Sequence, residues 1–237
     1  MATERPVVRP TMFGAANTDY AAGRDAEHIA HLAGGLDVIG MVECKNLALA
    51  RLAPEGFTAH QWTAKRRRPG RRRPRDAAKA GCGIVLRDAT LRPRQGAELE
   101  LKIGVRPVLG RRRVRMLTRY IACLAVEHVV TGEPFYLVVV HFPPERFERL
   151  WPRVVRRVRR IAARHPNVVI MTDANMPAAA LVDLLDLAEL TYYGEEVMAV
   201  LWNRHQLDPK VVQTDRWGRR HRATGHPTVV AGLAHRR

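Results

Sequence analysis

The stretch VVIMTDAN at residues 168–175 decides the fold class that we expect for this chain. Its first four residues form an unbroken apolar run, which is typical of a strand buried on both faces. Asp173 and Asn175 follow this run, and an extended backbone would place both side chains on the same side. A carboxylate and an amide would then contact one bound group. A turn that leaves a core strand uses the same residue types and is the alternative interpretation.

Three more predicted strands also end in a polar side chain. A helix predicted at 24–32 separates the first two, and the order strand, helix, strand indicates an α/β class. For Glu43, the alternative is that it only opens a solvated loop. The strands and their terminal groups are 10–17 (PTMFGAAN) ending at Asn17, 36–42 (LDVIGMV) followed by Glu43, and 134–140 (PFYLVVV) followed by His141.

Net charge indicates the kind of partner. The chain has 40 Lys and Arg against 23 Asp and Glu, which gives a net charge of +17. Such a balance attracts polyanions, and nucleic acid is the commonest polyanion inside cells. The alternative is a compositional bias toward arginine and alanine from a GC-rich genome. We expect nucleic acid as the partner, DNA more than RNA, and we predict no protein partner.

Length and hydropathy limit the compartment and the domain organisation. The 237 residues are enough for a substantial core, and we expect a flexible segment at 1–10 followed by one domain at 11–237. No apolar run is long enough to span a bilayer, and the start resembles no signal peptide. We therefore expect a cytoplasmic protein without a membrane partner. The three cysteines form neither a disulfide framework nor a CxxC metal motif.

An insertion at about 63–80 concentrates the positive charge. Eight of the eleven residues at 65–75 are Lys or Arg, and the prolines and glycine among them disfavour a helix. We expect a loop that contacts phosphate groups independently of sequence, and a solvated insertion is the alternative. The candidate nucleic-acid-binding residues are Lys65, Arg66, Arg67, Arg68, Arg71, Arg72, Arg73 and Arg75.

The remaining chain continues the alternation of strands and helices. His28 and His31 are three residues apart, and without further ligands we interpret both as surface histidines. Other expected elements are a strand within 114–130, an arginine-rich helix at 145–165, a helix at 178–187, strands at 196–202, 210–213 and 228–233, and a basic loop at 217–222.

The polar groups at the strand ends form a coherent chemical set. Glu43, assisted by the amide oxygen of Asn17, offers the hard oxygen ligands that suit Mg²⁺ or Mn²⁺. Asp173 can orient or deprotonate a water molecule that Asn175 positions. Two imidazoles can stabilise or protonate phosphoryl oxygens, namely His141 and His226. This set predicts metal-assisted hydrolysis of a phosphate ester.

The order of these segments resembles the endonuclease/exonuclease/phosphatase superfamily, which contains pancreatic-type deoxyribonuclease and the abasic-site endonucleases. The resemblance covers about residues 11–234 and implies a four-layer α/β sandwich of two mostly antiparallel sheets flanked by helices. It also implies one or two divalent cations that assist attack of water on a phosphate ester. The resembling pieces are Asn17, DVIGMVE at 37–43, VVHFPP at 139–144, TDAN at 172–175 where the family usually has Gly-Asp-x-Asn, and GHPTVV at 225–230 where it usually has Asp-His-x-Pro-Val.

Two positions depart from the family pattern. Gly225 stands where the family has a metal-binding aspartate, and Met198 falls near the aspartate that orients the last histidine. No acidic residue stands where a partner of His141 is expected. The acidic residues that could substitute are Glu195, Glu196, Asp208 and Asp215.

A metal-dependent nuclease is the first hypothesis from the sequence. The second is a member of the same fold whose site has decayed at Gly225 and Met198 and which binds nucleic acid without turnover. The third is a phosphatase or phosphodiesterase for small substrates, which would not need the basic insertion.

Overall fold

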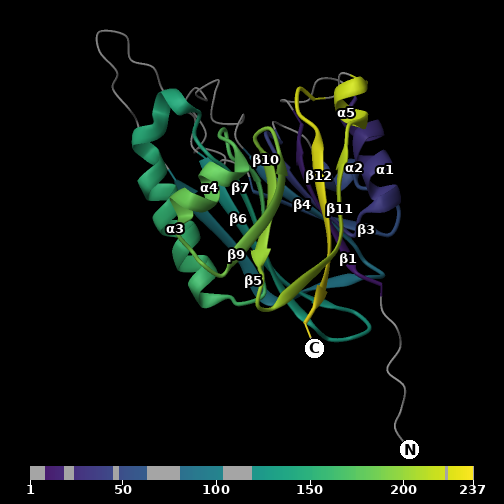
Figure 1. The fold of residues 1–237 in the computed structure, drawn as a ribbon. Helices are drawn as coiled ribbons and strands as arrows, with labels where there is room; N and C mark the ends of the chain where they lie inside the picture. The colour runs from purple at the N-terminus through teal and green to yellow at the C-terminus, as the bar shows by residue number, and fades with distance from the viewer. Residues whose placement is uncertain are drawn as a thin grey trace, which may run out of the picture.

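Two six-stranded sheets pack face to face, and helices cover their outer faces (Figure 1). The computed structural model describes residues 9–18, 24–44, 48–62, 81–103, 119–221 and 224–236. The candidate contacts at 65–75 and most of the predicted flexible segment at 1–10 lie outside these residues. The order of layers is helix, sheet, sheet, helix, which confirms the predicted four-layer sandwich.

The first sheet has the strand order β11-β12-β1-β2-β4-β3. Its described pairings are antiparallel except for β1 and β2, which run parallel. Because β12 lies beside β1, the two ends of the chain meet in one sheet. The strands are β1 (Thr11–Asn17), β2 (Val38–Val42), β3 (Phe57–Trp62), β4 (Cys82–Arg87), β11 (Leu207–Asp215) and β12 (Thr228–His235).

The second sheet has the strand order β5-β6-β7-β8-β10-β9. Here β7 and β8 form the parallel pair, so each sheet is mostly antiparallel as predicted. The strand expected within 114–130 is β6, which ends at His128 because a turn begins at Val129, whereas residues 114–118 lie outside the described residues. The strands are β5 (Leu91–Ile103), β6 (Arg119–His128), β7 (Pro134–His141), β8 (Val168–Asp173), β9 (Leu190–Glu195) and β10 (Met198–Asn203).

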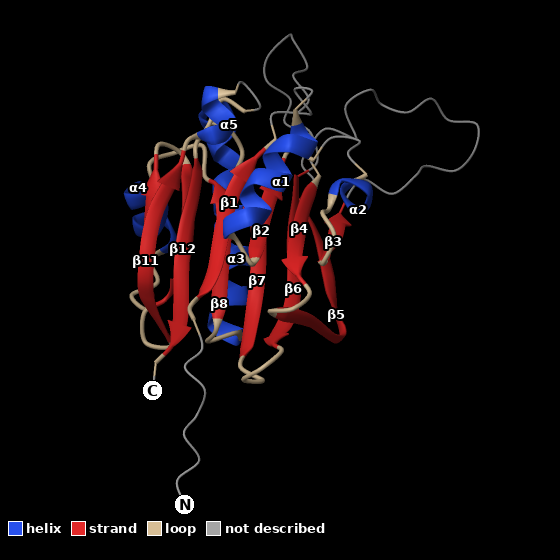
Figure 2. Ribbon diagram, turned by 90° about the vertical axis from the view of Figure 1, so that its right-hand side faces the viewer, coloured by secondary structure: helices blue, strands red, loops and turns tan. Residues whose placement is uncertain are grey.

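Four of the described α-helices lie on the two outer faces, whereas α5 lies at the upper end of the sheets (Figure 2). α3 and α4 pack on the second sheet, whereas α1 and α2 pack on the first. No described helix is long and apolar enough to cross a membrane. The helices are α1 (Asp25–Gly35), α2 (Leu49–Leu52), α3 (Trp151–Arg164), α4 (Ala178–Leu185) and α5 (Trp217–Arg220).

Two predicted elements differ from the structure. The helix expected at 145–165 is divided, because Phe147 has non-helical backbone angles and a 3-10 helix at Glu145–Leu150 precedes α3. The basic loop expected at 217–222 contains the one-turn helix α5. Pro152 lies in the first turn of α3, as predicted, where its missing N–H has no helical partner.

Three apolar layers separate the four structural layers. The central one lies between the sheets and includes Phe13, Val139 and Met171, whereas the outer ones lie beneath the helices. Gly40 of β2 marks a close approach of the two sheets, because a Cβ atom there would lie 2.7 Å from Cβ of Met171. The sheets are therefore fixed in their relative position by close packing.

The parallel strand pairs place polar groups at one end of the sandwich. In the first sheet, Asn17 pairs with Val42, so the ends of β1 and β2 are adjacent. In the second sheet, His141 pairs directly with Asp173. Since β1 packs on β8 and β2 packs on β7, the four strand ends meet across the interface between the sheets.

Candidate functional site

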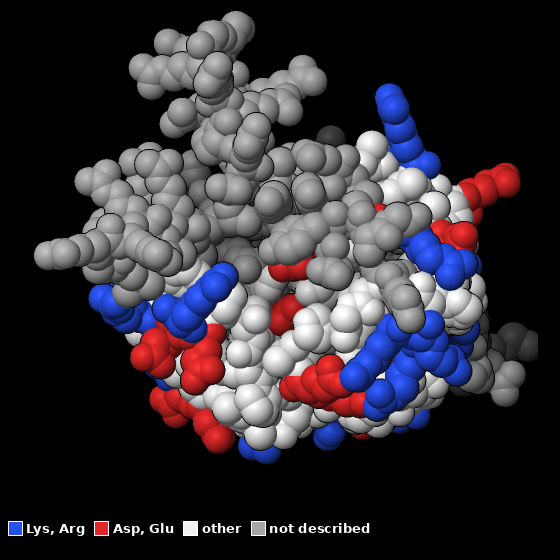
Figure 3. Space-filling view, turned by 90° about the horizontal axis from the view of Figure 1, so that it is seen from above, with Lys and Arg blue, Asp and Glu red and all other residues white. Residues whose placement is uncertain are grey.

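Four of the predicted site residues lie together where the two parallel strand pairs end. Asn17, Glu43, His141 and Asp173 are all buried, with exposed fractions of 4, 8, 3 and 2%. Seen from above, this end of the molecule shows acidic atoms in a central depression with Lys and Arg groups at both sides (Figure 3). The structure thus brings these four side chains together at one end of the sandwich.

His141 lies between two carboxylates. Its Nδ1 is 3.6 Å from Oε1 of Glu43, and its Nε2 is 3.8 Å from Oδ2 of Asp173. Both acids are nearly inaccessible to solvent, so little water screens their charges. The sequence pattern indicated no acidic partner for His141. The structure shows that Glu43 is such a partner.

Asp173 is held from two directions. Its Oδ2 accepts a hydrogen bond of 2.8 Å from the side-chain amide of Asn17, which belongs to the other sheet. Its Oδ1 accepts a hydrogen bond of 3.0 Å from the backbone N–H of Asn175. These bonds fix the orientation of the carboxylate relative to His141.

Asn175 corrects one sequence prediction. Its φ of 51° is left-handed, so the backbone does not remain extended after Asp173 and the two side chains do not share a face. The side-chain amide instead donates a 2.9 Å hydrogen bond to the carbonyl oxygen of Phe142. The turn that was the alternative interpretation is therefore present. Its hydrogen bond to Phe142 connects the end of β8 to the end of β7.

Glu43 does not open a solvated loop. It is buried beside His141 and has a left-handed φ of 61°, which is uncommon for a residue with a side chain. The backbone on either side is fixed: Thr18 N–H donates to the Val42 carbonyl, and Cys44 N–H donates to the Gly81 carbonyl. The unusual backbone turns the carboxylate toward the site.

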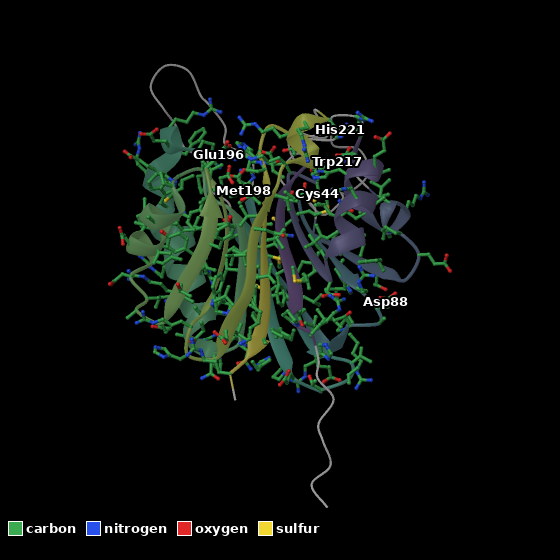
Figure 4. The ribbon with its side chains drawn as sticks, turned by 45° about the vertical axis from the view of Figure 1, so that its right-hand side comes forward. Cys44, Asp88, Glu196, Met198, Trp217 and His221 are labelled. Carbon is green, nitrogen blue, oxygen red and sulfur yellow. The ribbon has the colours of Figure 1, made fainter. Side chains whose placement is uncertain are left out.

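His226 lies in the loop that precedes β12. Its Nδ1 lies 3.6 Å from Oε2 of Glu196, which occupies the turn between β9 and β10 and has a φ of 54°. Met198, the first residue of β10, pairs with Asp173, so this turn belongs to the same end of the sheets. Figure 4 shows Glu196, Met198 and Cys44 at that end and Asp88 at the opposite end. Among the four acidic candidates from the sequence, the structure selects Glu196.

Helix α5 supports the loop that carries His226. Arg219 of α5 pairs with Glu196, and Arg216 pairs with Glu195. His28 stacks on Trp217 at a centroid distance of 5.5 Å and is 1% exposed, so its interpretation as a surface histidine was wrong. The helical spacing of α1 could not reveal this burial, because α5 comes from a distant part of the sequence. Burial lowers the pKa of His28 to about 4.

The donor chemistry of the site fits a hard divalent cation. The carboxylate of Glu43 and the amide oxygen of Asn17 are atoms that Mg²⁺ accepts, and Mg²⁺ often binds through one or two carboxylates while keeping several waters. Within the described ranges, no three His, Cys, Asp or Glu side chains are grouped to hold a metal ion by themselves. Gly225 is exposed, and a Cβ atom added there would contact nothing within 4 Å. A ligand set of few protein atoms completed by water is the arrangement that these residues allow.

Comparison with known proteins identifies the fold. No protein-family model and no curated protein match the chain. Among solved structures, an endonuclease/exonuclease/phosphatase from Bacteroides vulgatus has a TM-score of 0.71 at 13% identity, over 97% of this chain and 100% of that one. The chain has the endonuclease/exonuclease/phosphatase fold. The predicted resemblance is thereby confirmed at the level of architecture.

Two further structures show that this endonuclease/exonuclease/phosphatase fold serves different substrates. The 3′ phosphatase NExo from Neisseria, bound to a product DNA hairpin, has a TM-score of 0.62 at 17% identity, over 94% of this chain and 99% of that one. A mannosyl-6-phosphatase from Bacteroides thetaiotaomicron has a TM-score of 0.65 at 12% identity, over 94% and 99%. The substrate must therefore be argued from this chain's own residues.

Proposed function

We propose that the chain is a divalent-metal-dependent phosphodiester hydrolase that cleaves nucleic acid, with DNA favoured over RNA. The observation that carries the proposal is the buried group in which His141 contacts both Glu43 and Asp173. The net charge of +17 supports a polyanionic substrate over a sugar phosphate. The fold supports the class of reaction, since its other members include phosphatases.

Each residue has a role that follows from its position. Glu43 and Asn17 would hold the cation, Mg²⁺ or Mn²⁺, which neutralises negative charge on the phosphate when it is bound. Asp173 would accept a proton from the attacking water, since both of its oxygens are fixed by hydrogen bonds.

The remaining groups would act on the phosphate or on its surroundings. His141 and His226 would donate to phosphoryl oxygens, with Glu43 and Glu196 holding the two rings. Asn175 would keep the ends of β7 and β8 in register through its bond to Phe142.

The proposal is tested by cleavage of plasmid and oligonucleotide DNA and RNA across a titration of Mg²⁺ and Mn²⁺. Asp173→Asn should lower the rate by about 10²–10⁴-fold. Asp88→Asn is the matched control, because Asp88 is exposed at the opposite end of the sheets. Metal-independent cleavage, or full activity of Asp173→Asn, would contradict the proposal.

Gly225 favours a second candidate, a nucleic-acid-binding protein without turnover. The chain has no carboxylate at this position, where the family pattern has a metal-binding aspartate. The two functions separate in one experiment: the second gives salt-dependent binding of DNA but no product at any metal concentration.

A further inference from the structure

Helix α3 presents a face of arginines to solvent. All five are exposed, and their spacings of three and four residues place them on one side of the helix. From the first to the last they span about 16 Å, at a rise of about 1.5 Å per residue. The residues of this outer α3 face are Arg153, Arg156, Arg157, Arg160 and Arg164.

The charges of the outer α3 face are not compensated within the part of the chain that the structure describes. No ion pair there involves any of the five side chains. Arg159 of the same helix differs, because it is half-buried and bonds to the Leu184 carbonyl and to the Asp186 carboxylate. Five like charges on about three turns repel one another, so an anionic partner would relieve that repulsion.

The opposite face of α3 excludes a membrane-inserted role. Val154, Val155 and Val158 are buried against the second sheet, together with two further apolar residues of the helix. An amphipathic helix that binds a bilayer buries its apolar face in the lipid, and here that face is already occupied by the core. The outer face therefore offers charge alone, which suits a phosphate backbone.

The outer α3 face begins at the rim of the candidate site. The indole N–H of Trp151, at the first residue of α3, donates a 2.8 Å hydrogen bond to the carbonyl oxygen of Pro143. Pro143 follows His141 by two residues on the chain segment that leaves β7. From this end, α3 runs along the outer face of the second sheet, so its arginine face starts close to the site (Figure 1).

We propose that the outer α3 face binds the phosphate backbone of a nucleic-acid duplex. This goes beyond hydrolysis at the site, because it requires neither metal nor turnover. B-DNA carries one negative charge per about 1.7 Å of axis, so a face about 16 Å long meets several phosphates. A plot of log K against log salt concentration has a negative slope. If about three of the arginines contact phosphates, their removal makes this slope less negative by about 3.

The test measures binding of a fluorescent duplex by the full chain in EDTA over a range of salt concentrations. One variant carries Arg→Gln at the five positions of the outer α3 face. The matched control loses the same formal charge from exposed arginines outside α3: Arg51→Gln, Arg92→Gln, Arg94→Gln, Arg204→Gln and Arg236→Gln. Thermal unfolding and turnover of a small phosphodiester with Mg²⁺ are recorded for both.

We expect the α3 variant to bind the duplex at least about tenfold more weakly than the control, with the reduced salt slope. Equal losses in both variants would mean that net charge alone matters and would overturn the proposal. Unchanged duplex binding, with loss of binding to vesicles of anionic lipid, would overturn it in favour of a membrane. Absence of ester turnover in every protein would reject the proposed hydrolysis and leave this binding surface standing.

Discussion

Asn17 and Asp173, which are 156 positions apart in the sequence, are joined by a buried hydrogen bond of 2.8 Å between the two sheets. Asn17 ends a strand of the first sheet and Asp173 ends a strand of the second. The bond therefore connects the two halves of the sandwich at the point where the proposed chemistry takes place. It links the stability of the protein to the orientation of its proposed base.

Replacing Asn17 by alanine should lower both stability and activity. The change removes a donor from a carboxylate that is 2% exposed, and leaving such a group less satisfied costs about 1–3 kcal/mol. Chemical denaturation measures the free energy of unfolding, and plasmid cleavage measures the activity. Asn167→Ala is the control, because Asn167 is only partly buried and lies in the turn before β8. Equal losses of stability and activity in Asn17→Ala and Asn167→Ala would show that the hydrogen bond between Asn17 and Asp173 does not contribute specifically.

Replacing Glu196 by glutamine should reduce kcat more than KM, since Glu196 is expected to hold His226 and not the substrate. The carboxylate lies 3.6 Å from His226 Nδ1, and loss of such a partner typically costs about 10–100-fold where it orients a ligating or catalytic histidine. Glu195→Gln is the control, because Glu195 is the neighbouring residue at the end of β9 but pairs with Arg216.

A double-mutant cycle separates this role from a merely structural one. In a His226→Gln background, the further change Glu196→Gln should have little effect on kcat, since the two residues act as one unit. Additive losses in the double variant would mean that Glu196 acts independently of His226.

Introducing a carboxylate at position 225 should strengthen metal binding. Gly225 is exposed and a new Cβ atom meets nothing within 4 Å, so Gly225→Asp can be accommodated without repacking. We expect the Mg²⁺ concentration at half-maximal cleavage to fall by about tenfold or more, because a charged oxygen ligand is added. Gly225→Asn tests whether the charge matters, and an unchanged Mg²⁺ requirement in Gly225→Asp would place the cation elsewhere.

Acidification should destabilise the protein through His28. Its folded pKa of about 4 lies below its ordinary value of 6.5 because burial disfavours the charged ring, an effect that Asp215 opposes and His31 reinforces. The unfolded state therefore binds the proton first, so this contribution to stability is complete above about pH 6.5. It is lost as the pH falls toward about 4, and the total is of the order of 3 kcal/mol.

The measurement is the free energy of unfolding between pH 7 and 4. His28→Gln should flatten this pH dependence, whereas His205→Gln should leave it unchanged because His205 is exposed. Activity should fall over the same range, since His28 packs beneath Gly218 of α5 and thus supports the Glu196 contact. Parallel pH profiles of the native protein and His28→Gln would refute the assignment.

The sequence predicted the strand ends but not the contacts between them. Unbroken apolar runs before Glu43, His141 and Asp173 identify buried strands, because a strand buried on both faces leaves no polar position. The partner of each histidine could not be predicted in this way. Glu196 approaches His226 through a turn with a left-handed backbone, and residue spacing carries no signal of that approach.

The local sequence pattern also failed to predict two edge strands, β3 and β9. Strands β3 and β9 carry mixed polar and apolar residues, because each lies at an edge of its sheet and is only partly buried. Their position follows from tertiary pairing with β4 and β10, which the local pattern does not encode. His28 was misjudged for a related reason, since the residue that buries it is Trp217.

The pairing of β1 with β12 also determines when the protein can be completed during synthesis. Residues 11–15 find their antiparallel partners at 229–233, nearly the whole length of the chain later. One edge of β1 therefore stays open on the ribosome until β12 emerges from the exit tunnel. A nascent chain that stops before that strand leaves Asn17 on an unfinished sheet, so the proposed site is complete only after β12 has paired with β1.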